Sequence, residues 1–332
     1  TDFSFATLDQ ALIHDANMRG AKFRLASLQG AELNKAELNG AYFTKANLSF
    51  ANLSEASLLQ THLRAANMTE ANLEGCHLRN ALLNRAKLNK ARFSKAILSG
   101  AQIQGAYLDG IQLDGADLSQ ANLAMSDLSG AYLKGADLSN ANLNGANLHK
   151  ADLSNTLANG VKMAAAILTK ASFKGASLVR ANLRDANLTD ADLSGVRLHR
   201  AYLVSCRLNN AQMNDVDLAG AYMLDARLSN ANLRGALLVR NYLSHATVNN
   251  ADLRNAAMSG ANLTGVDMNA VANVTGATFA KNQGLSNEMK AQLHERNAAI
   301  FPSSQRPQRS EEEVYFETTR RLHEVRVDLE YR

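Results

Sequence analysis

The sequence has few of the residues on which disulfide frameworks and aromatic cores depend. Its 332 residues include no Trp, 2 Cys and 2 Pro, and aromatic residues make up 5% of the chain. Two cysteines cannot form a disulfide framework in a chain of this length. The hydrophobic residues, 46% of the total, are mostly Ala and Leu. Any core is therefore narrow and contains few aromatic rings.

Long apolar runs and a strong charge imbalance are also absent. The longest apolar run, residues 163–168, is far shorter than the roughly 20 residues of a membrane-spanning helix, so no such span is expected. The net charge of +4 is small for this length and predicts neither a nucleic-acid-binding surface nor an acidic mimic of one. No basic and then apolar leader follows Thr1, and we expect a cytoplasmic location.

Motifs that carry chemistry are missing as well. There is no Gly-rich phosphate loop, no metal-binding spacing of Cys and His, and no nucleophile turn, and the histidines are scattered. We therefore expect no enzymatic activity, no cofactor and no metal site.

The dominant feature of the sequence is a repeat of five residues. Blocks such as ANLSE, ADLSQ and ANLRG follow one another from Thr1 to Ala270 without an insertion. The first residue of a block is mostly Ala, with Cys76 and Cys206 in two of these positions, and the third is almost always Leu, Ile, Met, Phe or Val. Neither a helix nor a continuous strand can keep such a pattern buried. A chain that coils can do so, if each block is a short extended segment followed by a turn.

The blocks resemble the pentapeptide-repeat family, whose signature A(D/N)LXX appears at residues 116–118, 141–143 and 191–193. The resemblance covers about residues 1–281. It implies an all-β solenoid, a right-handed, quadrilateral parallel β-helix with four blocks in each coil of 20 residues and about fourteen coils. Bacterial and organellar members also occur in lumenal spaces, so a lumenal or periplasmic location is the alternative to the cytoplasm.

Three irregularities interrupt the pattern. Residues 156–160 have Ala158 where a large interior residue belongs, which predicts a bulge or a thin core. One extra residue at Val271 shifts the frame. The first block is already in register at Phe3 with no capping element before it, so we expect either further chain upstream or a partner on this uncapped coil.

The repeat ends near Phe279, and residues 282–301 are predicted to be a capping helix. An N-cap at Ser286 or Asn287 precedes apolar residues at helical spacing. Residues 284–301 also resemble the tail of cyanobacterial members of the family. The residues expected to cover the last coil are Leu285, Met289, Leu293, Ile300 and Phe301.

The remaining residues divide into a linker, 302–310, and a C-terminal extension, 311–332. Ser310 before three glutamates, and the heptad spacing of Tyr315, Leu322 and Leu329, favour a helix. Alternation from Val325 to Tyr331 favours a strand. We predict a helix that binds a partner.

The tyrosines occupy outward positions. All six tyrosines in the repeats stand second in their blocks, and with 20 residues in a coil Tyr202, Tyr222 and Tyr242 stack in adjacent coils. Tyr and Arg beside apolar residues are typical of interaction hot spots, and the alternative is that the stacked tyrosines only stabilise adjacent strands. The residues predicted to bind a partner are Tyr202, Tyr222, Tyr242, Leu224, Val204, Leu237, Val239, Arg200 and Arg240.

These features predict a non-enzymatic scaffold, assembly factor or regulator that binds a protein and no nucleic acid. Some members of the resembled family imitate DNA and protect type II topoisomerases such as gyrase. That alternative is disfavoured because residues 1–280 carry 26 Lys and Arg against 22 Asp and Glu. A further alternative is an interaction module of a longer chain.

Overall fold

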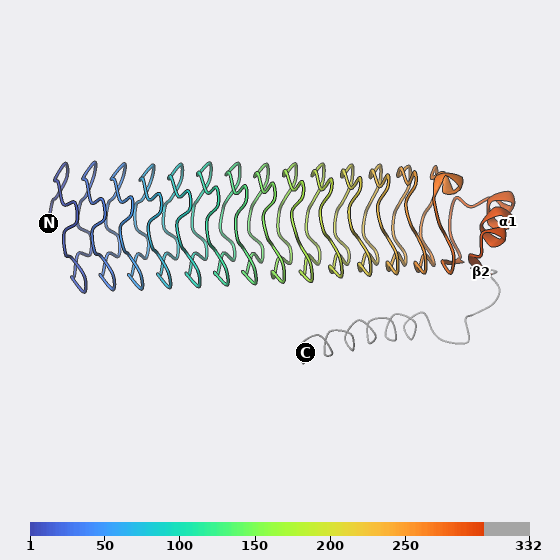
Figure 1. Cartoon of the computed structure of the whole chain (residues 1–332), viewed down its shortest axis with the longest axis horizontal. Helices are drawn as coiled ribbons and strands as arrows, with labels where there is room; N and C mark the ends of the chain where they lie inside the picture. Colours follow the sequence, from blue (N-terminus) through green and yellow to red (C-terminus); the bar gives the residue numbers. More distant parts are fainter. Residues whose placement is uncertain (302–332) are drawn as a thin grey trace, which may run out of the picture.

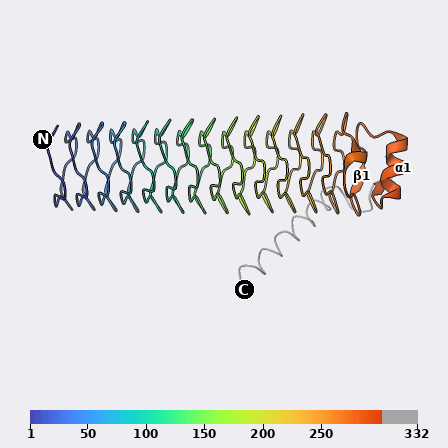
Figure 2. The same cartoon turned by 45° about the horizontal axis from the view of Figure 1, so that its top comes forward.

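The computed structural model describes residues 1–301, which form a long solenoid of coils stacked along one axis (Figure 1). From Asp2 to Tyr242, each second-position residue forms a parallel β-bridge with the residue 20 positions later. Four such rows run the length of the rod, and in the turned view the coils again follow one another along one straight axis (Figure 2). The expected coil of four blocks is therefore the one observed.

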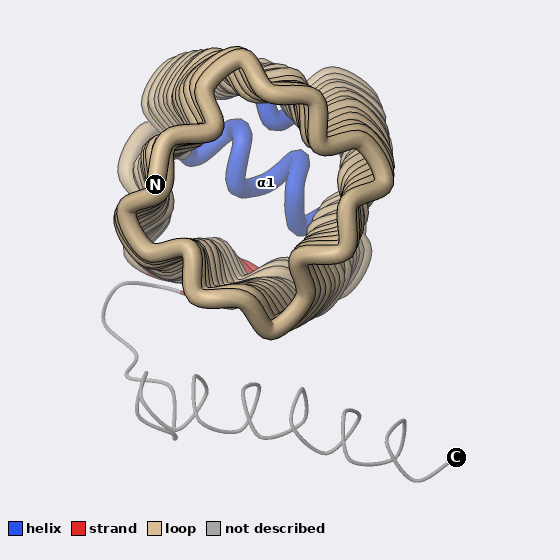
Figure 3. Tube along the Cα trace, turned by 90° about the vertical axis from the view of Figure 1, so that its left-hand side faces the viewer, coloured by secondary structure: helices blue, strands red, loops and turns tan. Residues whose placement is uncertain are grey.

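The interior is a narrow column of alternating small and large side chains. Ala141 and Leu143 are fully buried, whereas Asn142 between them points outward and is half-buried. Aromatic residues that enter this column stack coil on coil, since the ring centroids of Phe23 and Phe43 lie 4.6 Å apart. In the end-on view the coils lie one behind another around a common axis (Figure 3).

Backbone hydrogen bonds fix each block to its neighbours. The first N–H of a block closes a β-turn onto the third carbonyl of the preceding block, and the second, third and fifth N–H groups donate to adjacent coils. The fifth residue has a positive φ, for example 58° at Gln120. In the block 121–125, the first N–H donates to Leu118 O at 3.0 Å and the second to Ala101 O at 2.9 Å. The third donates to Asn142 O at 2.7 Å and the fifth to Asn144 O at 3.0 Å.

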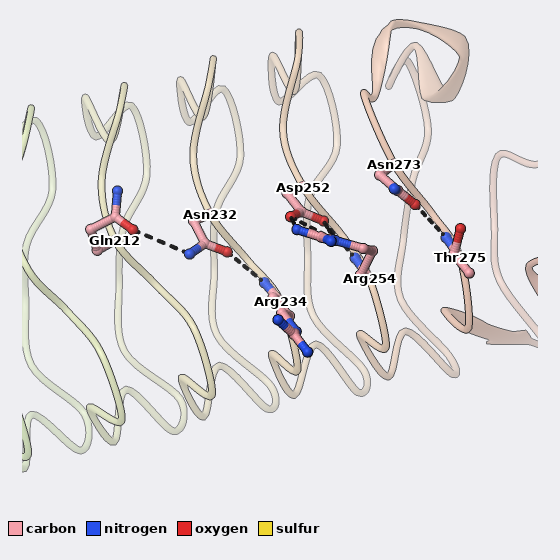
Figure 4. A network of polar contacts seen from close by, with 7 residues as sticks. All are labelled: Gln212, Asn232, Arg234, Asp252, Arg254, Asn273 and Thr275. Carbon is pink, nitrogen blue, oxygen red and sulfur yellow. Dashed lines mark hydrogen bonds and ion pairs between the residues drawn. The ribbon is translucent and has the colours of Figure 1, made fainter.

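The fourth N–H explains why Asn and Asp are common in second position. Arg234 N donates to Asn232 Oδ1 at 3.2 Å, and Arg254 N donates to Asp252 Oδ1 at 3.1 Å (Figure 4). An Asn can also donate to the preceding coil, as Asn232 Nδ2 does to Gln212 Oε1 at 3.1 Å. A short polar side chain in this position therefore satisfies a turn that the backbone alone leaves open.

The frame shift at Val271 is confirmed. A 3-10 helix, η1 (Met268–Ala270), precedes it, and beyond it the bridges join residues 21 apart, such as Asp252 and Asn273. The side chain of Asp267 caps η1 by accepting a hydrogen bond from Asn269 N at 3.0 Å. The extra residue is thus absorbed in one corner, and the coils continue beyond it.

The described chain ends in a small αβ unit. Strands β1 (Thr278–Ala280) and β2 (Ala299–Phe301) pair in parallel, and helix α1 (Asn287–Glu295) lies between them in the sequence. Ser286 is the N-cap, because its side chain accepts a hydrogen bond from Met289 N at 3.1 Å. In Figure 3, α1 lies across the end of the tube.

The residues expected to cover the last coil divide into two groups. Leu285 and Leu293 are buried in the core, and Met289 and Ile300 pack against it in part. Phe301 does not cover the coil, since 45% of its surface is exposed. The reason is that adjacent residues of a strand point to opposite sides, so Ile300 and Phe301 cannot both face the core.

The bulge predicted at residues 156–160 is wrong. The bridges from Asp137 to Leu157 and on to Ser177 continue without a shift, and Ala158 is fully buried. Inter-coil hydrogen bonds such as Ala158 N to Ser177 O at 2.7 Å hold the backbone whatever the size of the side chain. The predictions for residues 302–310 and 311–332 lie outside the described residues.

Candidate protein-binding face

A ladder of three tyrosine rings lies on one side of the rod. Tyr202, Tyr222 and Tyr242 are joined by successive β-bridges. Their ring centroids are 5.0 and 4.8 Å apart, and adjacent rings are within 6° of parallel. The three residues are 47%, 38% and 47% exposed, so the ladder combines a fixed geometry with an accessible aromatic surface.

These tyrosines depart from the pattern that stabilises the turns. An Asn or Asp in second position accepts a hydrogen bond from the fourth N–H of its own block, as Asp217 does from Ala219 N at 3.0 Å. A tyrosine hydroxyl is too far from its own backbone to do so. Stacking stabilises the ladder, but each tyrosine there replaces a residue type that serves the turn better.

Apolar and basic side chains border the ladder. Leu224 is 40% exposed, and Val204 and Val239 are half-buried. Arg200 and Arg240 are exposed in fifth positions at the corner that precedes the ladder. We call the tyrosine face the set Tyr202, Tyr222, Tyr242, Val204, Leu224, Val239, Arg200 and Arg240.

Leu237 does not belong to this face, although its second-position register predicted an exposed side chain. It is only 4% exposed. Ser177 and Asp217, in the same row, are buried as well. Leu157 and Arg197 stand in the same row and are exposed, so outward register alone does not decide exposure.

Asp217, a buried residue in the row of Leu237, has a carboxyl group with a shifted pKa. Burial raises the pKa of its carboxyl, while the hydrogen bond from Ala219 N and the charges of His199 and Arg197 act in the opposite direction. The sequence alone did not indicate this residue, since an aspartate in second position is usually half-exposed in this fold, as Asp152 is.

The row of the tyrosine ladder carries a second aromatic pair, nearer the N-terminus, that the sequence did not indicate. The rings of Tyr42 and His62 are stacked with centroids 4.5 Å apart. Tyr107 and Tyr132 are exposed in other rows, each without an aromatic bridge partner. A search for aromatic residues spaced by 20, with His included, would have found the pair.

Both cysteines lie in the interior, as their Ala positions predict. Cys76 and Cys206 are buried free thiols, and Cys206 Sγ donates to Leu183 O at 2.7 Å. Burial raises the pKa of Cys206 to about 12 and raises that of Cys76 as well.

Within residues 1–301, no group of three or more His, Cys, Asp or Glu side chains could hold a metal ion. No helix in that range has the length and apolar character to cross a bilayer.

Comparison with known proteins assigns the repeat. The family model for pentapeptide repeats matches residues 1–157, 166–235 and 242–271 through overlapping segments. No curated protein matches the chain. The family is defined by its repeat, and the match names no catalytic activity.

Several solved structures are similar. HetL, a pentapeptide repeat protein involved in heterocyst differentiation regulation from the cyanobacterium Nostoc sp. strain PCC 7120, is 28% identical, with 75% of this chain and 87% of that chain covered and a TM-score of 0.29. Full-length QnrB1, a plasmid-mediated fluoroquinolone resistance protein, is 22% identical over 60% and 91% of the two chains, with a TM-score of 0.32. A thylakoid-lumen protein from Arabidopsis thaliana is 18% identical over 45% and 81%, with a TM-score of 0.26. From the repeats matched, and from the parallel bridges that join residues 20 apart, the chain belongs to the pentapeptide repeat family and has its right-handed β-helix solenoid fold.

Proposed function

We propose that this protein is a non-enzymatic rod that binds a protein partner through the tyrosine face and acts as a scaffold, assembly factor or regulator. The observation that carries the proposal is the exposed ladder of Tyr202, Tyr222 and Tyr242 beside an exposed leucine and two exposed arginines. Tyr and Arg are the residue types most enriched where binding energy concentrates in interfaces.

Rigidity favours the same function. The stacked rings and the bridged backbone beneath them are ordered before any partner arrives, so binding costs little conformational entropy.

We also infer that the rod comprises about fourteen coils and is capped by residues 282–301. The function would be the same if this rod were a module of a longer chain.

Imitation of DNA in topoisomerase protection is not supported by the charge pattern. Such a surface needs continuous negative charge. Basic residues are in slight excess over residues 1–280, and Arg200 and Arg240 stand at the edge of the most aromatic part of the rod. A partner with an acidic edge fits this surface better than a cationic one.

The test is capture of the partner from native extract by immobilised protein, followed by a binding measurement with the purified partner. The variant Tyr222→Asn with Leu224→Ser removes the centre of the face, and Asn is a residue that the turn tolerates well. We expect at least a tenfold loss of affinity, since hot-spot residues each contribute 1 to 2 kcal/mol or more, roughly.

The matched control is Tyr132→Asn with Leu157→Ser, which removes an exposed tyrosine and an exposed leucine from other sides of the rod. It should bind as the unaltered protein does. Equal binding by both variants would show that the tyrosine face is not the interface.

A further inference from the structure

The corner before the tyrosine face changes its charge along the rod. This corner is formed by fifth-position residues spaced by 20. From Gly20 to Gly160 the row has no charged residue, and it then becomes basic. The residues of the row in that second part are Arg180, Arg200, Gly220, Arg240, Gly260 and Lys281.

The basic residues occupy backbone positions that glycine would occupy with less strain. The φ angles of Arg180, Arg200 and Arg240 are 58°, 54° and 53°. The intervening coils use Gly220 and Gly260 at φ 63° and 71°. All three arginine side chains are exposed, so they place positive charge in solvent beside the tyrosine face and cost the fold some backbone strain.

The described chain leaves the rod at this corner. Phe301, the last residue of β2, pairs in register with Ala280. Backbone hydrogen bonds connect this end of the rod to the corner row of fifth-position residues. Gly260 N donates to Ala280 O at 2.7 Å, and Arg240 N donates to Ser259 O at 2.9 Å. Phe301 therefore ends the described chain one residue before the position next in line after Arg240, Gly260 and Lys281.

The chain beyond Phe301 is long enough to return to the tyrosine face. About five coil steps separate Phe301, at the end of β2, from Arg200, which is about 24 Å at the spacing of adjacent strands. Residues 302–310 can span up to about 30 Å when extended. Glu311 can therefore reach Arg240 and Arg200.

The segment that arrives there is complementary to the face. Residues 311–317 read EEEVYFE, with four carboxylates beside Val314, Tyr315 and Phe316. No basic residue occurs from Glu311 to Thr319. The carboxylates match the arginine row, and the apolar and aromatic side chains match the tyrosine ladder and Leu224.

We propose that residues 311–317 of the same chain dock on the tyrosine face and cover it. This inference rests on the proposed function, because the docked segment is then a built-in competitor of the partner. A short tether raises the local concentration of the segment to the millimolar range, so a weak contact is enough to occupy the face. A partner gains access by displacing the segment.

The test uses the full chain with a nitroxide spin label on Thr318→Cys, the native cysteines being buried. Paramagnetic broadening of backbone amide signals reports which side of the rod the segment visits. We expect broadening at Arg200, Tyr222 and Arg240. The matched reference residues are Asn210, Asn230 and Asn250, fifth-position residues in the row half a coil away with φ of 60°, 59° and 58°, and these should remain sharp.

The triple variant Glu311→Gln, Glu312→Gln and Glu313→Gln should lose most of the broadening. High salt should reduce it as well, since salt screens exposed charges. Equal broadening of both corners, or none, would overturn the proposal. Broadening between spin-labelled chains and separate isotope-labelled chains would also overturn it, because the occupant would then be a second copy.

No partner enters this measurement, so it can fail while the capture experiment succeeds. If both inferences hold, removal of residues 311–332 should strengthen partner binding several-fold.

Discussion

Arg296, the residue after α1, donates a hydrogen bond from Nη1 to the carbonyl oxygen of Met268 at 3.0 Å. Its Nη2 donates to Val271 O. One side chain therefore holds the cap to both ends of η1, where the extra residue interrupts the repeat. The cap and the irregular corner form one unit, joined by a residue that no sequence pattern indicated.

Replacing this side chain should loosen the cap. Arg296→Met keeps an apolar stem but leaves both partly buried carbonyls without this donor, which costs about 1 to 3 kcal/mol. We expect hydrogen exchange to accelerate in residues 268–301 while the middle of the rod keeps its protection. Unchanged exchange in that segment would show that the cap is held by its apolar contacts alone.

Neighbouring residues in one block should differ widely in their contribution to stability. Leu143→Ala leaves a cavity in the core and should cost about 2 to 5 kcal/mol. Asn142→Ala removes bonds to Asn144 N at 3.2 Å and to Asn122 Oδ1 at 3.1 Å, and should cost roughly 1 kcal/mol. Denaturant unfolding of both variants measures the difference, and a larger loss for Asn142→Ala would contradict the inward position of the third residue.

Asp217 gives a pH dependence with a defined sign. Burial raises the pKa of its carboxyl in the folded chain, so the folded state holds this proton more tightly than the unfolded state does. Its ionisation therefore destabilises the fold as pH rises above the ordinary Asp pKa of about 3.9.

Asp217→Asn should raise the denaturant midpoint at pH 7, since Asn can still accept the hydrogen bond from Ala219 N. This gain in stability should shrink as pH falls and vanish at a pH where the Asp217 carboxyl of the parent is protonated in both the folded and the unfolded state. A variant that is less stable than the parent at pH 7 would mean that His199 and Arg197 outweigh the cost of burial.

The two thiols should be unreactive in the folded protein. Both are buried, and burial raises the pKa of Cys206 to about 12, so almost no thiolate exists at pH 8. Ellman's reagent should label neither cysteine within minutes in buffer and both in denaturant. Fast labelling of native protein would indicate that the coils around Cys76 or Cys206 open readily.

Much of the fold follows from the order of residues within a block. The Ala and Leu columns specify which side chains face inward, and Cys76 and Cys206 are buried because they occupy those columns. The frame shift at Val271 and the N-cap at Ser286 are local signals, and both predictions are confirmed. The tyrosine row of the proposed partner site follows from a spacing of 20, and the sequence also indicated its apolar and basic neighbours, whereas the burial of Leu237 depends on packing between coils.

The block pattern by itself therefore determined the inside and the outside of this protein, because a period of five with two apolar positions can be buried only by coiling. Its family resemblance supplied the number of blocks in a coil. Exposure, by contrast, was decided by tertiary structure: Leu237 is covered while Leu224 is open, although both were expected to face solvent. Arg296 joins segments that are distant in sequence, and contacts of this kind depend on how coils and cap pack against one another.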